Sequence, residues 1–157
     1  MTQLRERSTT ATRPRPDKAV LSGRDQPDGR LPMMLRTIGA IAVLVVGAVH
    51  LQQYLSGYNS ISVIGPLFIL NFAGATVIGL GLLVPAARLR PFHALLALGG
   101  IGLTAISFVF LFISEHQPLF GFQEHGYRAA IIIALATEAI ATVTLTAYLA
   151  THRRSRA

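Results

Sequence analysis

The fold of this chain follows from residues 129–150, AAIIIALATEAIATVTLTAYLA, in which Glu138 is the only acidic or basic side chain. A run of roughly 20 apolar residues is long enough to cross the hydrocarbon core of a bilayer as an α-helix. Three earlier runs meet the same criterion, at about 34–55, 62–84 and 92–114. We therefore predict one membrane domain over residues 33–150, with four transmembrane helices.

Two connections between these runs are short turns, at residues 56–61 and 85–91, and the third is a longer loop at 115–128. Helices joined by short connections pack as antiparallel neighbours, and a helix satisfies its own backbone hydrogen bonds inside lipid. The predicted fold is all-α, a four-helix transmembrane bundle in up-down-up-down order. Glycines inside the spans are expected at the contacts between helices, because small residues let the backbones approach each other.

Residues 1–32 differ from the rest of the chain, because they carry Pro14, Pro16, Pro27 and many charges without hydrophobic periodicity. Such a segment cannot bury enough apolar area to offset the entropy lost on ordering. We predict a disordered basic N-terminal tail over 1–32 and a short basic tail over 151–157.

Basic residues near the ends of spans mark the cytoplasmic side of a membrane protein. One side of the predicted bundle carries Arg24, Arg30, Arg36, Arg88, Arg90, Arg153, Arg154 and Arg156. The other side holds only Arg128, together with aromatic residues such as Tyr58 and Phe122 that are typical of a membrane interface. We predict a multi-pass protein of the plasma membrane with both termini in the cytoplasm.

The composition is 52% hydrophobic and 13% charged, which is poor in charge for a soluble fold. The formal net charge of +7 comes from residues that flank apolar runs, so we expect the lipid bilayer as a partner and no nucleic acid. The absence of cysteine excludes disulfides, thiolate metal sites and thiol catalysis from this chain.

Glu138 is the sharpest functional signal in the sequence. It lies near the middle of the last span, at a depth of roughly 14 Å by helix rise. An acidic group there is costly, so it is expected to face the bundle interior as a neutral carboxylic acid. Two interpretations stay open: a hydrogen bond that holds neighbouring helices together, or proton coupling and ligand binding.

His50 in the first span and Asn71 in the second lie at depths that Glu138 can also reach, since side chains tilt toward the N-terminus of their helix. We predict an intramembrane polar cluster of His50, Asn71 and Glu138. It would serve either as a proton relay, because histidine titrates near neutrality, or as a structural hydrogen-bond network.

A second, weaker candidate site lies in the connection between the last two spans, which carries Glu115, His116, Glu124 and His125. Histidine and carboxylate ligands suit zinc, copper or iron. The spacing matches no compact metal motif, so a solvated loop with incidental histidines is the alternative. The sequence names neither a metal nor a cofactor.

Residues 50–71, HLQQYLSGYNSISVIGPLFILN, carry a resemblance to a known group, together with Gly121 and Phe122, a glutamate in the same loop, and Glu138. The chain resembles uncharacterised small four-helix integral membrane proteins of actinobacteria over residues 34–150. The resemblance implies the four-span topology and assigns no activity.

No G-x-S-x-G, Walker, zincin or dinucleotide motif occurs in the chain, so we expect no enzyme. The leading prediction is an accessory or interaction subunit of a larger membrane complex. The alternative is a small proton-coupled or ligand-binding transporter that uses Glu138 and His50. Four spans form a narrow bundle, so transport would require a homodimer.

Overall fold

The computed structural model describes residues 30–85, 89, 91–124, 126 and 128–154. Its elements are α1 (Arg30–Leu55), the 3-10 turn η2 (Tyr58–Ser60), α2 (Ile64–Leu83), α4 (His93–His116) and α5 (Ala129–Arg154). All four α-helices are long and apolar enough to cross a membrane. The described residues form no β-strand beyond one isolated bridge between Leu119 and Phe122. The all-α four-helix prediction is therefore confirmed, and the helices fit a multi-pass membrane protein.

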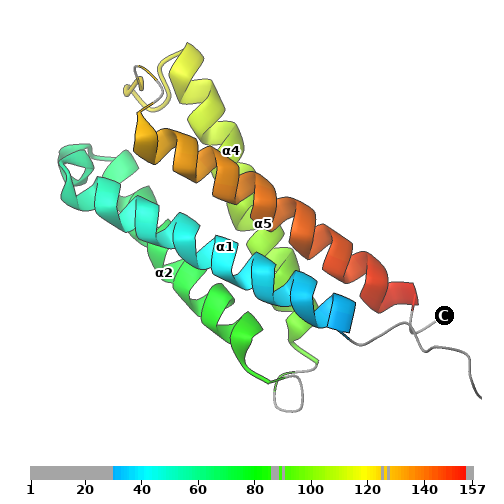
Figure 1. Ribbon diagram of the computed structural model, residues 1–157. Helices are drawn as coiled ribbons and strands as arrows, with labels where there is room; N and C mark the ends of the chain where they lie inside the picture. Colours follow the sequence, from blue (N-terminus) through cyan, green and yellow to red (C-terminus); the bar gives the residue numbers. More distant parts are fainter. Residues whose placement is uncertain (1–29, 86–88, 90, 125, 127, 155–157) are drawn as a thin grey trace, which may run out of the picture.

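The helices run up-down-up-down, as Figure 1 shows. α1 packs along α2 and α5, while α4 packs along α5 and less extensively along α2. α1 and α4 are diagonal and barely touch. Two ends of the bundle can be distinguished: the loop end, with residues 56–63 and 117–128, and the opposite end, where α1 starts and α5 finishes. The positive-inside rule predicts that the loop end is external.

The first and last helices of the chain, α1 and α5, are longer than the predicted spans. α1 begins at Arg30, within the segment predicted as a tail, and α5 continues to Arg154. Pro32 fits this start, because the first turn of a helix has no intrahelical partner for its N–H groups. The rest of the predicted tails, residues 1–29 and 155–157, lies outside the described residues.

Glycine brings α1 close to both of its neighbours. A Cβ atom at Gly47 would lie 2.8 Å from the Cβ of Ala75 on α2, and one at Gly79 would lie 2.5 Å from Leu44. A Cβ at Gly39 would lie 2.5 Å from Leu145 on α5. Packed carbon atoms do not approach this closely, so a side chain at Gly47 would push α1 away from α2, and one at Gly39 or Gly79 would displace the facing leucine.

The core lies between the helices and is built of small and branched side chains. Fully buried members are Ala40, Val43, Val46, Ala75, Leu82, Ala97, Ala141 and Leu145. The outer faces expose large apolar side chains, including Leu70, Val77, Leu95 and Val143. That arrangement is typical of helices whose outer face contacts lipid.

Candidate functional site

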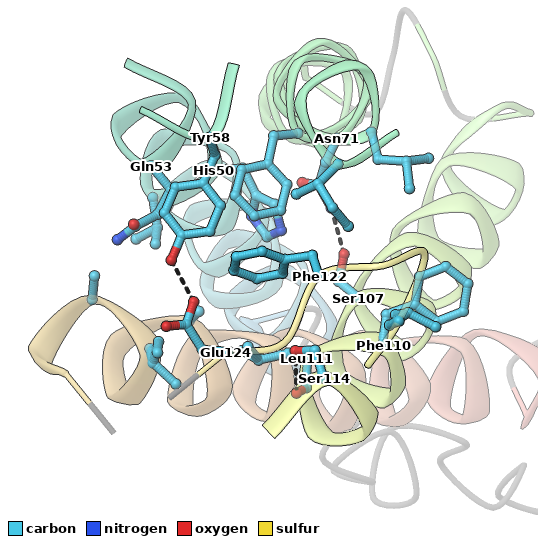
Figure 2. A pocket seen from close by; sticks show the side chains of 18 residues that line it. His50, Gln53, Tyr58, Asn71, Ser107, Phe110, Leu111, Ser114, Phe122 and Glu124 are labelled. Atoms are coloured by element: carbon cyan, nitrogen blue, oxygen red, sulfur yellow. Dashed lines mark hydrogen bonds between the residues drawn. The ribbon is translucent and has the colours of Figure 1, made fainter. Parts of the chain in front are cut away.

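A pocket of about 110 Å³ lies inside the bundle near the loop end. All four helices and both connections at that end contribute to it, and most of the wall is apolar. Its lining includes residues of α2 and α4, the two neighbouring helices with the least extensive contact. Figure 2 shows its polar members: His50, Gln53, Tyr58, Asn71, Ser107, Ser114 and Glu124.

His50 lines the pocket from α1, and its ring is held by its own helix. Nδ1 lies 2.9 Å from the carbonyl oxygen of Val46, one turn earlier. Because a carbonyl only accepts, Nδ1 carries the proton and Nε2 of the neutral ring is an acceptor. The ring also packs edge-on against Phe68, at 5.1 Å between centroids. Nε2 has no hydrogen-bond partner among the described residues.

Asn71 lines the pocket from α2 and joins α2 to α4. Its Nδ2 donates to the Ser107 hydroxyl oxygen at 2.5 Å, shown as a dashed line in Figure 2. Its other amide atom, Oδ1, is buried and has no partner among the described residues. The sequence did not identify Ser107 as a partner, because a lone serine in an apolar span is usually bonded to its own backbone.

Tyr58, Glu124 and Arg128 form a hydrogen-bonded group at the loop end, here called the loop triad, and its first two members line the pocket. The Tyr58 hydroxyl donates to Glu124 Oε2 and accepts a bond from Arg128 Nη2. Arg128 Nη2 also lies 2.9 Å from Glu124 Oε1. Since Tyr58 follows α1 and Glu124 precedes α5, the triad links the two connections of the loop end. Burial, reinforced by Glu124, raises the pKa of Tyr58 to about 12.

Aromatic rings complete this cover. The Tyr58 ring stacks on Phe68, with 5.2 Å between centroids, and meets the edge of Phe122 at 5.3 Å. The backbone N–H of Glu124 donates to the carbonyl oxygen of Ser114 at 3.0 Å, which fixes the loop on the end of α4. The sequence placed Tyr58 and Phe122 at the membrane interface; the fold also turns both toward the pocket.

Glu138 is fully buried on α5, with 0% of its surface exposed. It lies one turn deeper than Ala134, which lines the pocket, but is not itself a lining residue. Neither carboxyl oxygen has a hydrogen-bond partner among the described residues. Thr142, one turn further, is instead bonded across to Thr104 at 2.9 Å.

The predicted polar cluster is thus assembled only in part. His50 and Asn71 line the same pocket, and no hydrogen bond joins either of them to Glu138. The reason is depth: Glu138 follows Ala134 by one turn on the same buried face of α5, so it lies below the pocket that Ala134 and Ile131 line. A functional role for Glu138 stays a prediction.

The residues of the weaker candidate site lie in different environments. Glu124 belongs to the loop triad, while His116 is exposed and donates from Nδ1 to the carbonyl oxygen of Phe112 at 2.7 Å. Oε1 of Glu115 is buried without a partner in the part of the chain that the structure describes. His125 lies outside the described residues. Within those residues no three histidine or acidic side chains are grouped as a metal site would need.

Comparison with protein-family models, with curated proteins and with solved structures gives no match for this chain. The function is therefore argued from the chemistry of the pocket: apolar walls, two acceptors without a partner among the described residues, and a cover made by the loop triad.

Proposed function

We propose that this chain is a non-enzymatic membrane protein that binds a small, predominantly apolar molecule in the pocket at the loop end. The observation that carries the proposal is the pocket itself, which all four helices line and which combines apolar walls with a few convergent polar groups. That combination is typical of sites for small molecules, where apolar area supplies affinity and a few polar groups fix orientation.

The size of the pocket limits the ligand. An apolar cavity of about 150 Å³ takes up benzene, so a pocket of about 110 Å³ accommodates a body of roughly one ring. The wall includes Ile64, Leu67, Leu111 and Ile131, which bury apolar surface without competing for hydrogen bonds.

Entry at the loop end is consistent with the position of the loop triad. Tyr58, Phe122 and Glu124 line the pocket from the two connections at this end of the bundle. Because the positive-inside rule predicts an external loop end, the ligand would enter from the outer side of the membrane.

Fluorobenzene tests this proposal, with ¹⁹F NMR on the protein purified in mild detergent. We expect a resonance from bound fluorobenzene that is lost in Ala134→Leu, which fills the pocket, and retained in Ala136→Leu. The control is matched because Ala136 lies on the same helix and is exposed on its outer face, whereas Ala134 is 4% exposed. Equal signals from both variants, or no bound signal in the wild type, would overturn the proposal.

The same preparation tests the accessory-subunit prediction. A subunit of a larger complex should retain partner proteins at fixed stoichiometry in mild detergent, whereas a ligand-binding protein should purify as a lone chain or a homodimer. Stoichiometric partners combined with no bound fluorobenzene would favour the accessory role.

A further inference from the structure

Two hydrogen-bond acceptors in the pocket point to the chemistry of its ligand. The first is Nε2 of His50, because Nδ1 is committed to the Val46 carbonyl at 2.9 Å. This hydrogen bond lies within α1, so it holds the ring in place whether or not a ligand is present. Nε2 therefore offers a lone pair to a donor and, in the neutral ring, no proton of its own.

The second acceptor is Oδ1 of Asn71. The amide nitrogen is committed to Ser107 across the α2–α4 interface, and Oδ1 is left buried without a partner among the described residues. A buried acceptor without a donor costs free energy. A ligand that donates a hydrogen bond to Oδ1 removes this unfavourable free energy.

The Tyr58 hydroxyl does not supply that donor. Its proton goes to Glu124, and its oxygen accepts from Arg128. The Tyr58 hydroxyl is thus occupied by the loop triad. The acceptors on His50 and Asn71 have no partner among the described residues and are left for an incoming molecule.

The shape of the molecule follows from the walls. Tyr58, Phe68, Phe110 and Phe122 all contribute to the lining. Aromatic rings pair favourably in edge-to-face and offset geometries, as His50 and Phe68 already do. A flat ring therefore fits these walls better than a branched chain of equal volume.

We infer that the pocket binds a single-ring aromatic molecule bearing a hydroxyl group, a phenol, whose O–H donates to His50 Nε2 or to Asn71 Oδ1. This inference rests on the proposed function and gives it a ligand class. The ring occupies the apolar part of the pocket, and the hydroxyl selects this molecule over an apolar one of the same size.

Phenol and toluene test the inference, because they have nearly the same shape and differ by a hydroxyl in place of a methyl group. Each is titrated against bound fluorobenzene in the wild-type protein. Toluene is the less hydrated of the two, so tighter binding of phenol requires a hydrogen bond inside the pocket. We expect phenol to displace fluorobenzene at a lower free concentration than toluene does.

Two variants then assign the acceptor. His50→Phe keeps an aromatic ring and removes Nε2, and Asn71→Leu keeps the volume and removes Oδ1. We expect at least one of them to lower the preference for phenol over toluene by roughly three- to tenfold. Size-exclusion chromatography checks that each variant is folded.

The inference is overturned if toluene binds the wild type as tightly as phenol, or if both folded variants keep the wild-type preference. In either case displacement by toluene would leave the proposed function standing. Failure of both probes to displace fluorobenzene that is bound in the pocket would also overturn the inference, whereas an absence of bound fluorobenzene would overturn the proposed function itself.

Discussion

The hydroxyl of Tyr58, which follows α1, donates its proton to the carboxylate of Glu124, which precedes α5. Residues 66 positions apart thereby close the loop end over the pocket, with Arg128 bonded to both. This hydrogen bond requires the Tyr58 side chain to be neutral, because an ionised tyrosine has no proton to donate and would repel the carboxylate of Glu124.

The pH dependence of the loop triad follows from this link. The pKa of Tyr58 is raised to about 12, first by burial and then by Glu124, against about 10 in an unfolded chain. A raised folded pKa means that the stabilisation is fully present below pH 10 and is lost as the pH rises through about 12.

The difference in phenolate absorbance between wild type and Tyr58→Phe isolates this titration from those of the other tyrosines. We expect the difference to titrate near pH 12. A difference that titrates near pH 10, the value of a free tyrosine, would show that the loop triad does not form. The same difference measured with Tyr54→Phe is the control, because Tyr54 is not a member of the loop triad.

Replacing the buried Glu138 by an apolar residue is predicted to stabilise the protein. Because neither carboxyl oxygen has a partner among the described residues, an apolar side chain of similar length loses no hydrogen bond. We expect Glu138→Met to raise the free energy of unfolding, by about 1–3 kcal/mol for an unsatisfied buried group. The measurement is thermal or denaturant unfolding in detergent.

Thr142→Val is the matched comparison on the same helix. It removes the bond between Thr142 and Thr104 and is expected to destabilise by about 0.6 kcal/mol, a typical interhelical value. If Glu138→Met destabilises as well, Glu138 has a partner such as water, a ligand or a second chain. Glu138→Gln then separates shape from chemistry: a folded variant that loses the cellular phenotype would favour proton or cation handling.

The third prediction concerns the close approach of α1 to α2 at Gly47. Gly47→Ala places a methyl group 2.8 Å from the Cβ of Ala75, so α1 and α2 must move apart. We expect a loss of about 1–3 kcal/mol, typical of overpacking. Gly102→Ala meets no atom within 4 Å and should instead stabilise α4, by about 0.5–1 kcal/mol. Equal effects of the two substitutions would contradict the observed α1–α2 contact.

Membrane orientation is a separate prediction from the arginine distribution. Reporter fusions at Gly57, Ala87, Phe120 and the C-terminus should alternate outside, inside, outside, inside. A C-terminus on the outer side would contradict the predicted orientation, and with it the entry of the ligand from outside.

The sequence predicted the architecture well, because length and hydrophobicity alone define a helix that crosses a bilayer. It also placed Glu138 inside the bundle, since ionisable groups avoid lipid. It did not predict which residues would meet. His50 and Asn71 share a pocket while Glu138 lies a turn below it, because the sequence gives the depth of a residue only to within a few positions and does not show where the pocket ends.

The loop triad was beyond sequence reasoning for a different reason. Residue type grouped Glu124 with Glu115, His116 and His125. Its side chain instead bonds to Tyr58, 66 positions earlier in the chain, and to Arg128 in its own loop. Arg128, the only basic residue on its predicted side, was the available signal, because a lone cation near carboxylates commonly forms an ion pair.

The central claim, that the pocket binds a phenol, is tested most directly by locating one. An experimental structure with 4-bromophenol would place its ring by the anomalous signal of bromine. We predict bromine inside the pocket, with the hydroxyl oxygen within hydrogen-bond distance of His50 Nε2 or Asn71 Oδ1. Bromine found only on the lipid-facing surface, with the pocket unchanged, would contradict the claim.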